Sequence, residues 1–154
     1  MSEPLKVFDL PWDKYEDSLF CDIPNISLID LSVTRRNVLS ILQRVFDPIG
    51  FTCPFTLLPK LYLQNSCETK LSWDAELPED IKRKFLKWVK EFPLLSSVKI
   101  PRLLPLTKGR SFSLHTFADA SQGSYASAVY LGSQNKDVKV TLVQAKSRVA
   151  PLKK

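Results

Sequence analysis

One aspartate stands where a carboxylate could do chemistry. Asp119 lies in the segment HTFADAS (residues 115–121), at the end of a run typical of a β-strand. A carboxylate there could be one ligand of a two-metal site, in which several acidic residues hold two divalent ions about 4 Å apart for phosphodiester hydrolysis. An aspartate at a strand end is also typical of a turn or a cap. Because one carboxylate cannot hold two cations, Asp119 alone predicts no complete site.

Other kinds of catalytic and metal chemistry lack their motifs. The sequence has no Gly-x-x-x-x-Gly-Lys-Ser/Thr phosphate loop, no Gly-x-Ser-x-Gly elbow, no Asp-Thr-Gly or Asp-Ser-Gly, and no adjacent Asp-Asp pair. His115 is the only histidine, and the three cysteines contain no Cys-x-x-Cys spacing. These absences argue against a phosphate-loop enzyme, a serine hydrolase, an aspartic protease, a polymerase palm, a zinc site and a disulfide framework.

The distribution of charge points to a polyanionic partner. Residues 1–31 hold two basic and seven acidic residues, whereas residues 32–154 hold twenty basic and nine acidic ones. Excess positive charge favours nucleic acid, although a charged outer helix face is also typical of a solvated surface. The candidate phosphate contacts lie in two predicted helices: Arg35, Arg36, Lys82, Arg83, Lys84, Lys87 and Lys90.

The elements that must position these residues begin with three predicted helices. Thr34 is a suitable N-cap for a helix that runs through Phe46 and ends at the DPIG turn (residues 47–50). A second helix begins near Thr52, with Pro59 expected to kink or restart it. The third begins at residues 77–80, where a proline and two acids suit the first turn, and Pro93 ends it.

From Ser111 onward the pattern changes to strands. Runs rich in aromatic and β-branched residues at 112–117, 125–131 and 138–144 predict a three-stranded antiparallel meander. Residues 1–31 read as short extended pieces and turns. The fold class is therefore predicted as α+β, a helical module followed by a three-stranded antiparallel meander that we expect to be truncated, because no covering helix follows it.

Five segments carry a resemblance to a known family. In chain order they resemble the Pol polyprotein of BEL/Pao long-terminal-repeat retrotransposons, in a region often labelled a Pao retrotransposon peptidase. They are TRRNVLS (34–40), FDPIG (46–50), LSWD (71–74), HTFADAS (115–121) and AKSRVAP (145–151). The resemblance implies that residues 1–30 end a reverse-transcriptase palm-like region, 31–105 form a helical thumb or connection, and 110–154 begin an RNase H-like domain.

The same resemblance sets the expected function. Asp119 takes the position of the first RNase H carboxylate, a Mg²⁺ ligand in the parent enzyme, while this chain by itself is expected to hold no cofactor and to be catalytically incomplete. The expected partners are an RNA/DNA hybrid or DNA and the remainder of the Pol polyprotein, with no membrane. The chain is expected to be intracellular, cytoplasmic or nuclear, and not secreted. The alternative is a domesticated protein-interaction or scaffold module that uses the Trp/Phe stripe of the third helix.

Overall fold

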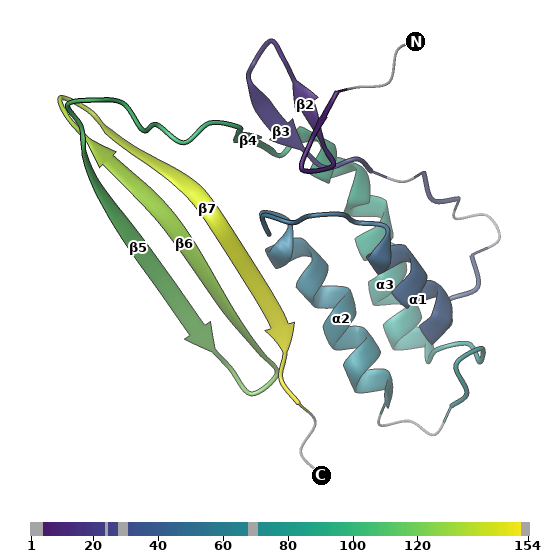
Figure 1. Cartoon of the computed structure of the whole chain (residues 1–154). Coiled ribbons are helices and arrows are strands. Elements are labelled where there is room, and N and C mark those ends of the chain that lie inside the picture. The colour runs from purple at the N-terminus through teal and green to yellow at the C-terminus, as the bar shows by residue number, and fades with distance from the viewer. Residues whose placement is uncertain (1–4, 24, 28–30, 68–70, 152–154) are drawn as a thin grey trace.

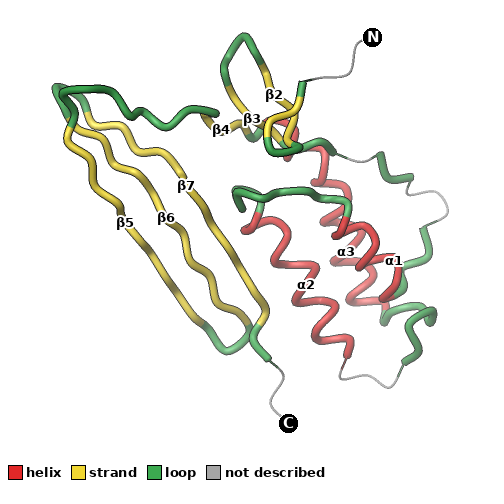
Figure 2. Tube along the Cα trace, in the orientation of Figure 1, coloured by secondary structure: helices red, strands yellow, loops and turns green. Residues whose placement is uncertain are grey.

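The computed structural model describes residues 5–23, 25–27, 31–67 and 71–151. Along the described part of the chain, short strands come first, helices follow, and further strands come last, so that the helices lie between two separate antiparallel sheets (Figures 1 and 2). The chain is therefore α+β, as the sequence predicts. In the described part of the chain, no helix is long and apolar enough to cross a membrane.

The three helices begin close to where the sequence predicts. Helix α1 (Arg35–Gln43) is capped by Thr34, whose side chain accepts a hydrogen bond from the Asn37 amide at 3.2 Å. The helix is predicted to run through Phe46, but it ends earlier, at Gln43. Helix α2 (Cys53–Cys67) continues through the buried Pro59 and does not restart there.

Helix α3 (Glu79–Glu91) begins with two acids in its first turn, as predicted, and continues into a 3₁₀ helix, η1 (Phe92–Ser97). Its apolar side forms the core between the helices. Phe85, Trp88 and Phe92 are at most 3% exposed, and the Trp88 indole donates a hydrogen bond to the Phe55 carbonyl at 2.9 Å. The scaffold alternative required this stripe as an outer surface. Because the stripe lies in the core, it offers no such surface in this fold.

A small sheet joins the start of the chain to the segment after α3. Its strands are β1 (Lys6–Val7), β2 (Leu10–Asp13), β3 (Ser18–Phe20) and β4 (Lys99–Pro101), in that order. Strand β4 pairs antiparallel with β3 through Ile100 and Leu19. The sheet thus combines residues from two segments, 1–30 and 31–105, that the resemblance assigns to different regions.

The predicted meander forms the second sheet. Its strands are β5 (Ser111–Ala120), β6 (Ser124–Gln134) and β7 (Val138–Val149), each longer than predicted. Strand β6 lies between β5 and β7, and the β6–β7 register shifts between Val129 and Tyr130. The helix that packs against this sheet comes before it in the sequence. This helix is α2, which runs beside β7 (Figure 1). The Ala145 amide donates to the Ile49 carbonyl at 2.7 Å, and the Ser147 hydroxyl to the Cys53 carbonyl at 3.4 Å.

Candidate nucleic-acid interface and the Asp119 carboxylate

Asp119 is the penultimate residue of β5, with its Cα opposite Ala126 of β6. Its side chain is exposed, and one carboxylate oxygen accepts a hydrogen bond from the Ala120 amide at 2.9 Å. Strand alternation places it on the same face as Phe117, whose ring contacts Tyr130 with the centroids 5.9 Å apart. A pocket of about 570 Å³, lined mainly by apolar side chains of this face and of the start of α2, reaches Asp119.

The residues around Asp119 do not make a metal site by themselves. Among the described residues, no group of three or more His, Cys, Asp and Glu side chains could hold a metal ion. His115 shares the face of Asp119, but it lies four positions earlier on the strand, roughly 13 Å away. Asp137 lies at the far end of the sheet, roughly 26 Å along β5, where it pairs with Arg110 at 2.7 Å. Within the described part of the chain, a pair of Mg²⁺ ions would therefore find one carboxylate ligand here, which is too few to hold both ions.

The cations of α3 lie opposite its buried stripe. Arg83, Lys84, Lys87 and Lys90 are exposed, and none makes an ion pair among the described residues. Lys82 differs, because its side chain is 27% exposed and its amine lies 3.2 Å from a Glu76 carboxylate oxygen. We call the four exposed residues the α3 basic surface.

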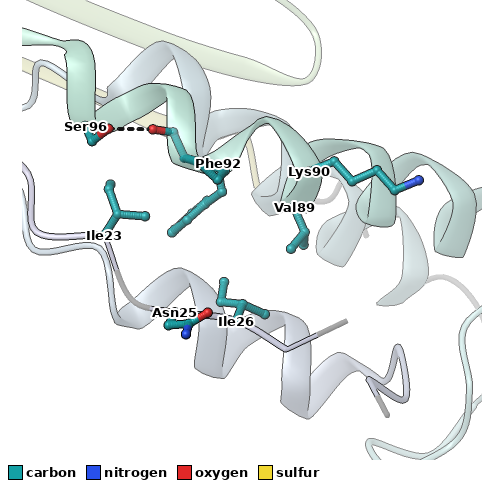
Figure 3. Close-up of a pocket in the computed structure, with 8 residues that line it drawn as sticks. Ile23, Asn25, Ile26, Val89, Lys90, Phe92 and Ser96 are labelled. Atoms are coloured by element: carbon teal, nitrogen blue, oxygen red, sulfur yellow. Dashed lines mark hydrogen bonds between the residues drawn. The ribbon is translucent and has the colours of Figure 1, made fainter. Parts of the chain in front are cut away.

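A shallow pocket of about 490 Å³ borders the end of this surface. Figure 3 shows the apolar side chains of Val89 and Phe92 pointing toward Ile23 and Ile26, while the Lys90 amine extends along the helix away from them. Lys90 therefore presents its charge to solvent rather than to the pocket.

The two arginines of α1 have different surroundings. Arg36 is exposed and pairs with Asp74, with its Nε 2.6 Å from the carboxylate, and hydrogen bonding from Arg36 lowers the pKa of Asp74. Arg35 is 6% exposed, and its guanidinium donates to the Ser66 hydroxyl at 3.1 Å, to the Leu71 carbonyl at 2.7 Å and to the Ser66 carbonyl. The phosphate contact predicted for Arg35 is therefore replaced by a structural role, the joining of α1 to the end of α2.

Sequence reasoning missed three side chains close to Asp119. Strand alternation places Tyr125, Lys146 and Arg148 on the other face of the β5–β6–β7 sheet, and these three side chains and Asp119 are among the residues that line a pocket of about 370 Å³. The predicted third strand ended at residue 144, so both cations fell outside it. The alternation of exposed and less exposed residues from Gln144 to Arg148 is the signal that would have extended the strand.

Comparison with known proteins places this architecture in a family. The model of the Pao retrotransposon-like RNaseH-like domain matches residues 34–154. The chain belongs to this family. The Pao match begins at the N-cap of α1 and includes both the helices and the β5–β6–β7 sheet, so the chain is related to a retrotransposon Pol protein, as the resemblance implied. No curated protein and no solved structure matches the chain.

Proposed function

We propose that this chain binds an RNA/DNA duplex through the α3 basic surface and contributes Asp119 as the first carboxylate of an RNase H-type site. The observation that carries the proposal is the set of four exposed cations on one helix, none of which forms an ion pair with another described residue. Lys87 follows Arg83 by four residues and Lys84 by three, and Lys90 follows Lys87 by three, so their side chains share one face. Over this length the helix rises about 10 Å.

Unpaired cations suit phosphate binding better than paired ones do. An arginine such as Arg36 must give up its contact with Asp74 before it binds a phosphate, whereas Lys84, Lys87 and Lys90 give up only water and small ions. Phosphate contacts are independent of base sequence, so the α3 basic surface supports binding to many duplexes with little sequence preference.

The experiment measures the salt dependence of duplex binding. Changing Lys84, Lys87 and Lys90 to Ala should weaken binding of a labelled RNA/DNA hybrid at every salt concentration. The slope of log affinity against log salt should become shallower by about 2–3 units, because about 0.9 counterions are released per phosphate contact.

A matched control removes the same charge elsewhere. Lys14, Lys108 and Lys136 are exposed lysines outside α3, and changing these three to Ala lowers the net charge equally. The control should leave the slope nearly unchanged. If the α3 variant keeps the wild-type slope, the surface is only solvated and the proposal fails.

The catalytic part of the proposal concerns Asp119. With one carboxylate at the site, we propose that residues 1–154 alone do not cleave a hybrid in the presence of Mg²⁺. A longer Pao-type Pol chain that supplies further carboxylates should cleave it, and Asp119→Asn should abolish that cleavage while duplex affinity is retained. Cleavage by the 154-residue chain that Asp119→Asn removes would overturn the proposed incompleteness. A longer active chain that tolerates Asp119→Asn would leave this residue only a turn former.

A further inference from the structure

The face of the β5–β6–β7 sheet opposite Asp119 gathers three cations because of the irregularity in β7. Ser127 pairs with Lys146, and Tyr125 with Arg148, but beyond the register shift Ser133 pairs with Lys139. In a regular strand the odd-numbered Lys139 and the even-numbered Lys146 would point to opposite faces. The extra residue in β7 restores them to one face. We call the exposed part of this surface, around Lys146 and Arg148, the open basic face; nearer Lys139, the side chains of Leu131, Ser133 and Thr141 on the same face are at most 8% exposed.

The open basic face is electrostatically one-sided. Among the described strand residues that alternation places on this face, none is acidic; Asp119, which alternation places on the other face, is the one acidic residue that also lines its pocket. Lys146 and Arg148 are exposed and make no ion pair with any described residue. Such a surface attracts polyanions, and its cations need not leave a carboxylate to bind one.

The end of this face near Asp119 is concave and carries an aromatic ring. Small side chains, among them Ala118, Ala120 and Ser127, line the pocket of about 370 Å³ together with the two cations. Tyr125, at 45% exposure, lines the same pocket and sits directly opposite Arg148 in the register. The pocket volume lies in the range of small-molecule sites, which are about 300–1,000 Å³.

We propose that the open basic face binds single-stranded nucleic acid, with a base stacked on Tyr125 and phosphates held by Lys146 and Arg148. An exposed ring beside unpaired cations is the arrangement that recognises unpaired bases without sequence preference. In a duplex the bases stack on one another and cannot lie flat on a tyrosine, so this site favours a single strand over the hybrid. The site shares no residue with the α3 basic surface, so either binding proposal can be contradicted without affecting the other.

The test uses the full chain and a labelled oligothymidylate of about 12 nucleotides, which spans one binding site of this type. Changing Lys146 and Arg148 to Gln should make the salt slope shallower by about 1.4 units, from 0.7 counterions released per contact on a single strand. Tyr125→Leu should weaken binding about tenfold, and Tyr125→Phe should keep it because the ring remains. Circular dichroism and thermal melting of each variant establish that the sheet is intact.

Matched controls assign the result to this face. Lys108→Gln with Lys136→Gln removes the same charge outside it, and should change the slope little. The α3 triple-alanine variant should still bind the oligothymidylate. Equal losses for Tyr125→Leu and Tyr125→Phe would overturn the stacking, and an unchanged slope in the Lys146/Arg148 variant would overturn the site. Competition by polyglutamate as strong as that by the oligothymidylate would instead indicate an acidic protein partner and also overturn the proposal.

Discussion

The burial of a single side chain determines whether that side chain stabilises the fold or is available to bind a ligand. Trp88 lies on the same helix as the α3 basic surface, but its ring is enclosed by three aromatic neighbours. Its centroid lies 4.9 Å from those of Phe55 and Phe92 and 5.6 Å from that of Phe85. These contacts tie α3 and η1 to α2, so Trp88 holds the basic surface in place without forming part of it.

Replacing Trp88 should therefore destabilise the fold. Trp88→Ala should lower the free energy of unfolding by about 3–5 kcal/mol, because it leaves a large cavity and an unpaired Phe55 carbonyl. Trp88→Phe should cost less, because it keeps much of the ring contact. Urea denaturation followed by circular dichroism measures both values, and a loss below about 1 kcal/mol for Trp88→Ala would contradict the burial.

The cysteines differ in reactivity for the same reason. Cys21 is 1% exposed, its thiol lies 3.5 Å from the Phe46 carbonyl, and burial raises its pKa to about 12. Cys67 is exposed at the end of α2. Because the thiolate is the reactive form, iodoacetamide at neutral pH should label Cys67 in the native protein and Cys21 only after unfolding. Mass spectrometry of the labelled peptides checks the order, and early labelling of Cys21 would contradict it.

The residue types alone predict which side of α3 is buried and which side is exposed. The spacing of Phe85, Trp88 and Phe92 marks one apolar face, and the lysines between them mark the other. Arg35 and Arg36 look alike in sequence, yet one is buried and the other exposed. What separates them is the position of Ser66 and the Leu71 carbonyl, more than thirty residues away. No local pattern contains that contact.

At the scale of elements, the turn between α1 and α2 fixes the sheet against the helices. The Asp47 carboxylate accepts hydrogen bonds from the Gly50 amide and from the Thr52 amide and hydroxyl, each at 2.6 Å. Gly50 has a φ of +91°, and a Cβ on it would lie 1.8 Å from the Ala145 carbonyl oxygen in β7. The turn thus needs a glycine both for its backbone conformation and for the close approach of β7.

Gly50→Ala should separate β7 from this turn, and Gly109→Ala is its matched control. Gly109 also has a positive φ, +83°, but nothing lies within 4 Å of its Cβ position. The control should cost about 1–2 kcal/mol from the backbone alone, and Gly50→Ala clearly more. Because the Cys53 thiol lies 3.9 Å from the Ala145 carbonyl, faster alkylation of Cys53 should report the separation. Equal effects of the two substitutions would contradict this role of Gly50.

The residues at which helices and strands begin can be predicted from the local sequence. The elements that they pair with or pack against cannot. The Thr34 cap, the acids that begin α3 and the alternating runs of β5 and β6 are visible in the sequence. Strand β4 is only three residues long, and its pairing with β3 spans about eighty residues. The packing of α2 along β7 likewise depends on the contact between Gly50 and Ala145. The sequence therefore could not show that α2 packs against this sheet.

At the scale of the whole molecule, ion pairs help to close the chain between its N-terminal strands and the segment after α3. Arg102 lies with its Nε 2.5 Å from an Asp17 oxygen and its guanidinium 4.9 Å from the centroid of Trp12. Lys99 lies 2.8 Å from Asp13 and 2.7 Å from Glu16. Hydrogen bonding from Arg102 lowers the pKa of Asp17, and hydrogen bonding from Lys99 lowers that of Asp13.

This closure should weaken in acid. A carboxylate whose pKa is lowered by folding stabilises the protein above its unfolded pKa, near 4 for aspartate, and that contribution is lost as pH falls through the folded value. The free energy of unfolding should therefore drop below about pH 4. Asp17→Asn should lower stability at neutral pH and flatten the acid limb, since its side chain does not titrate. Asp9→Asn, at a carboxylate without an ion pair among the described residues, is the control and should keep the wild-type slope. Urea unfolding at a series of pH values measures the free energy of unfolding of both variants. If that of Asp17→Asn falls in acid as steeply as that of the wild type, the Asp17–Arg102 pair does not stabilise the contact between the N-terminal strands and the segment after α3.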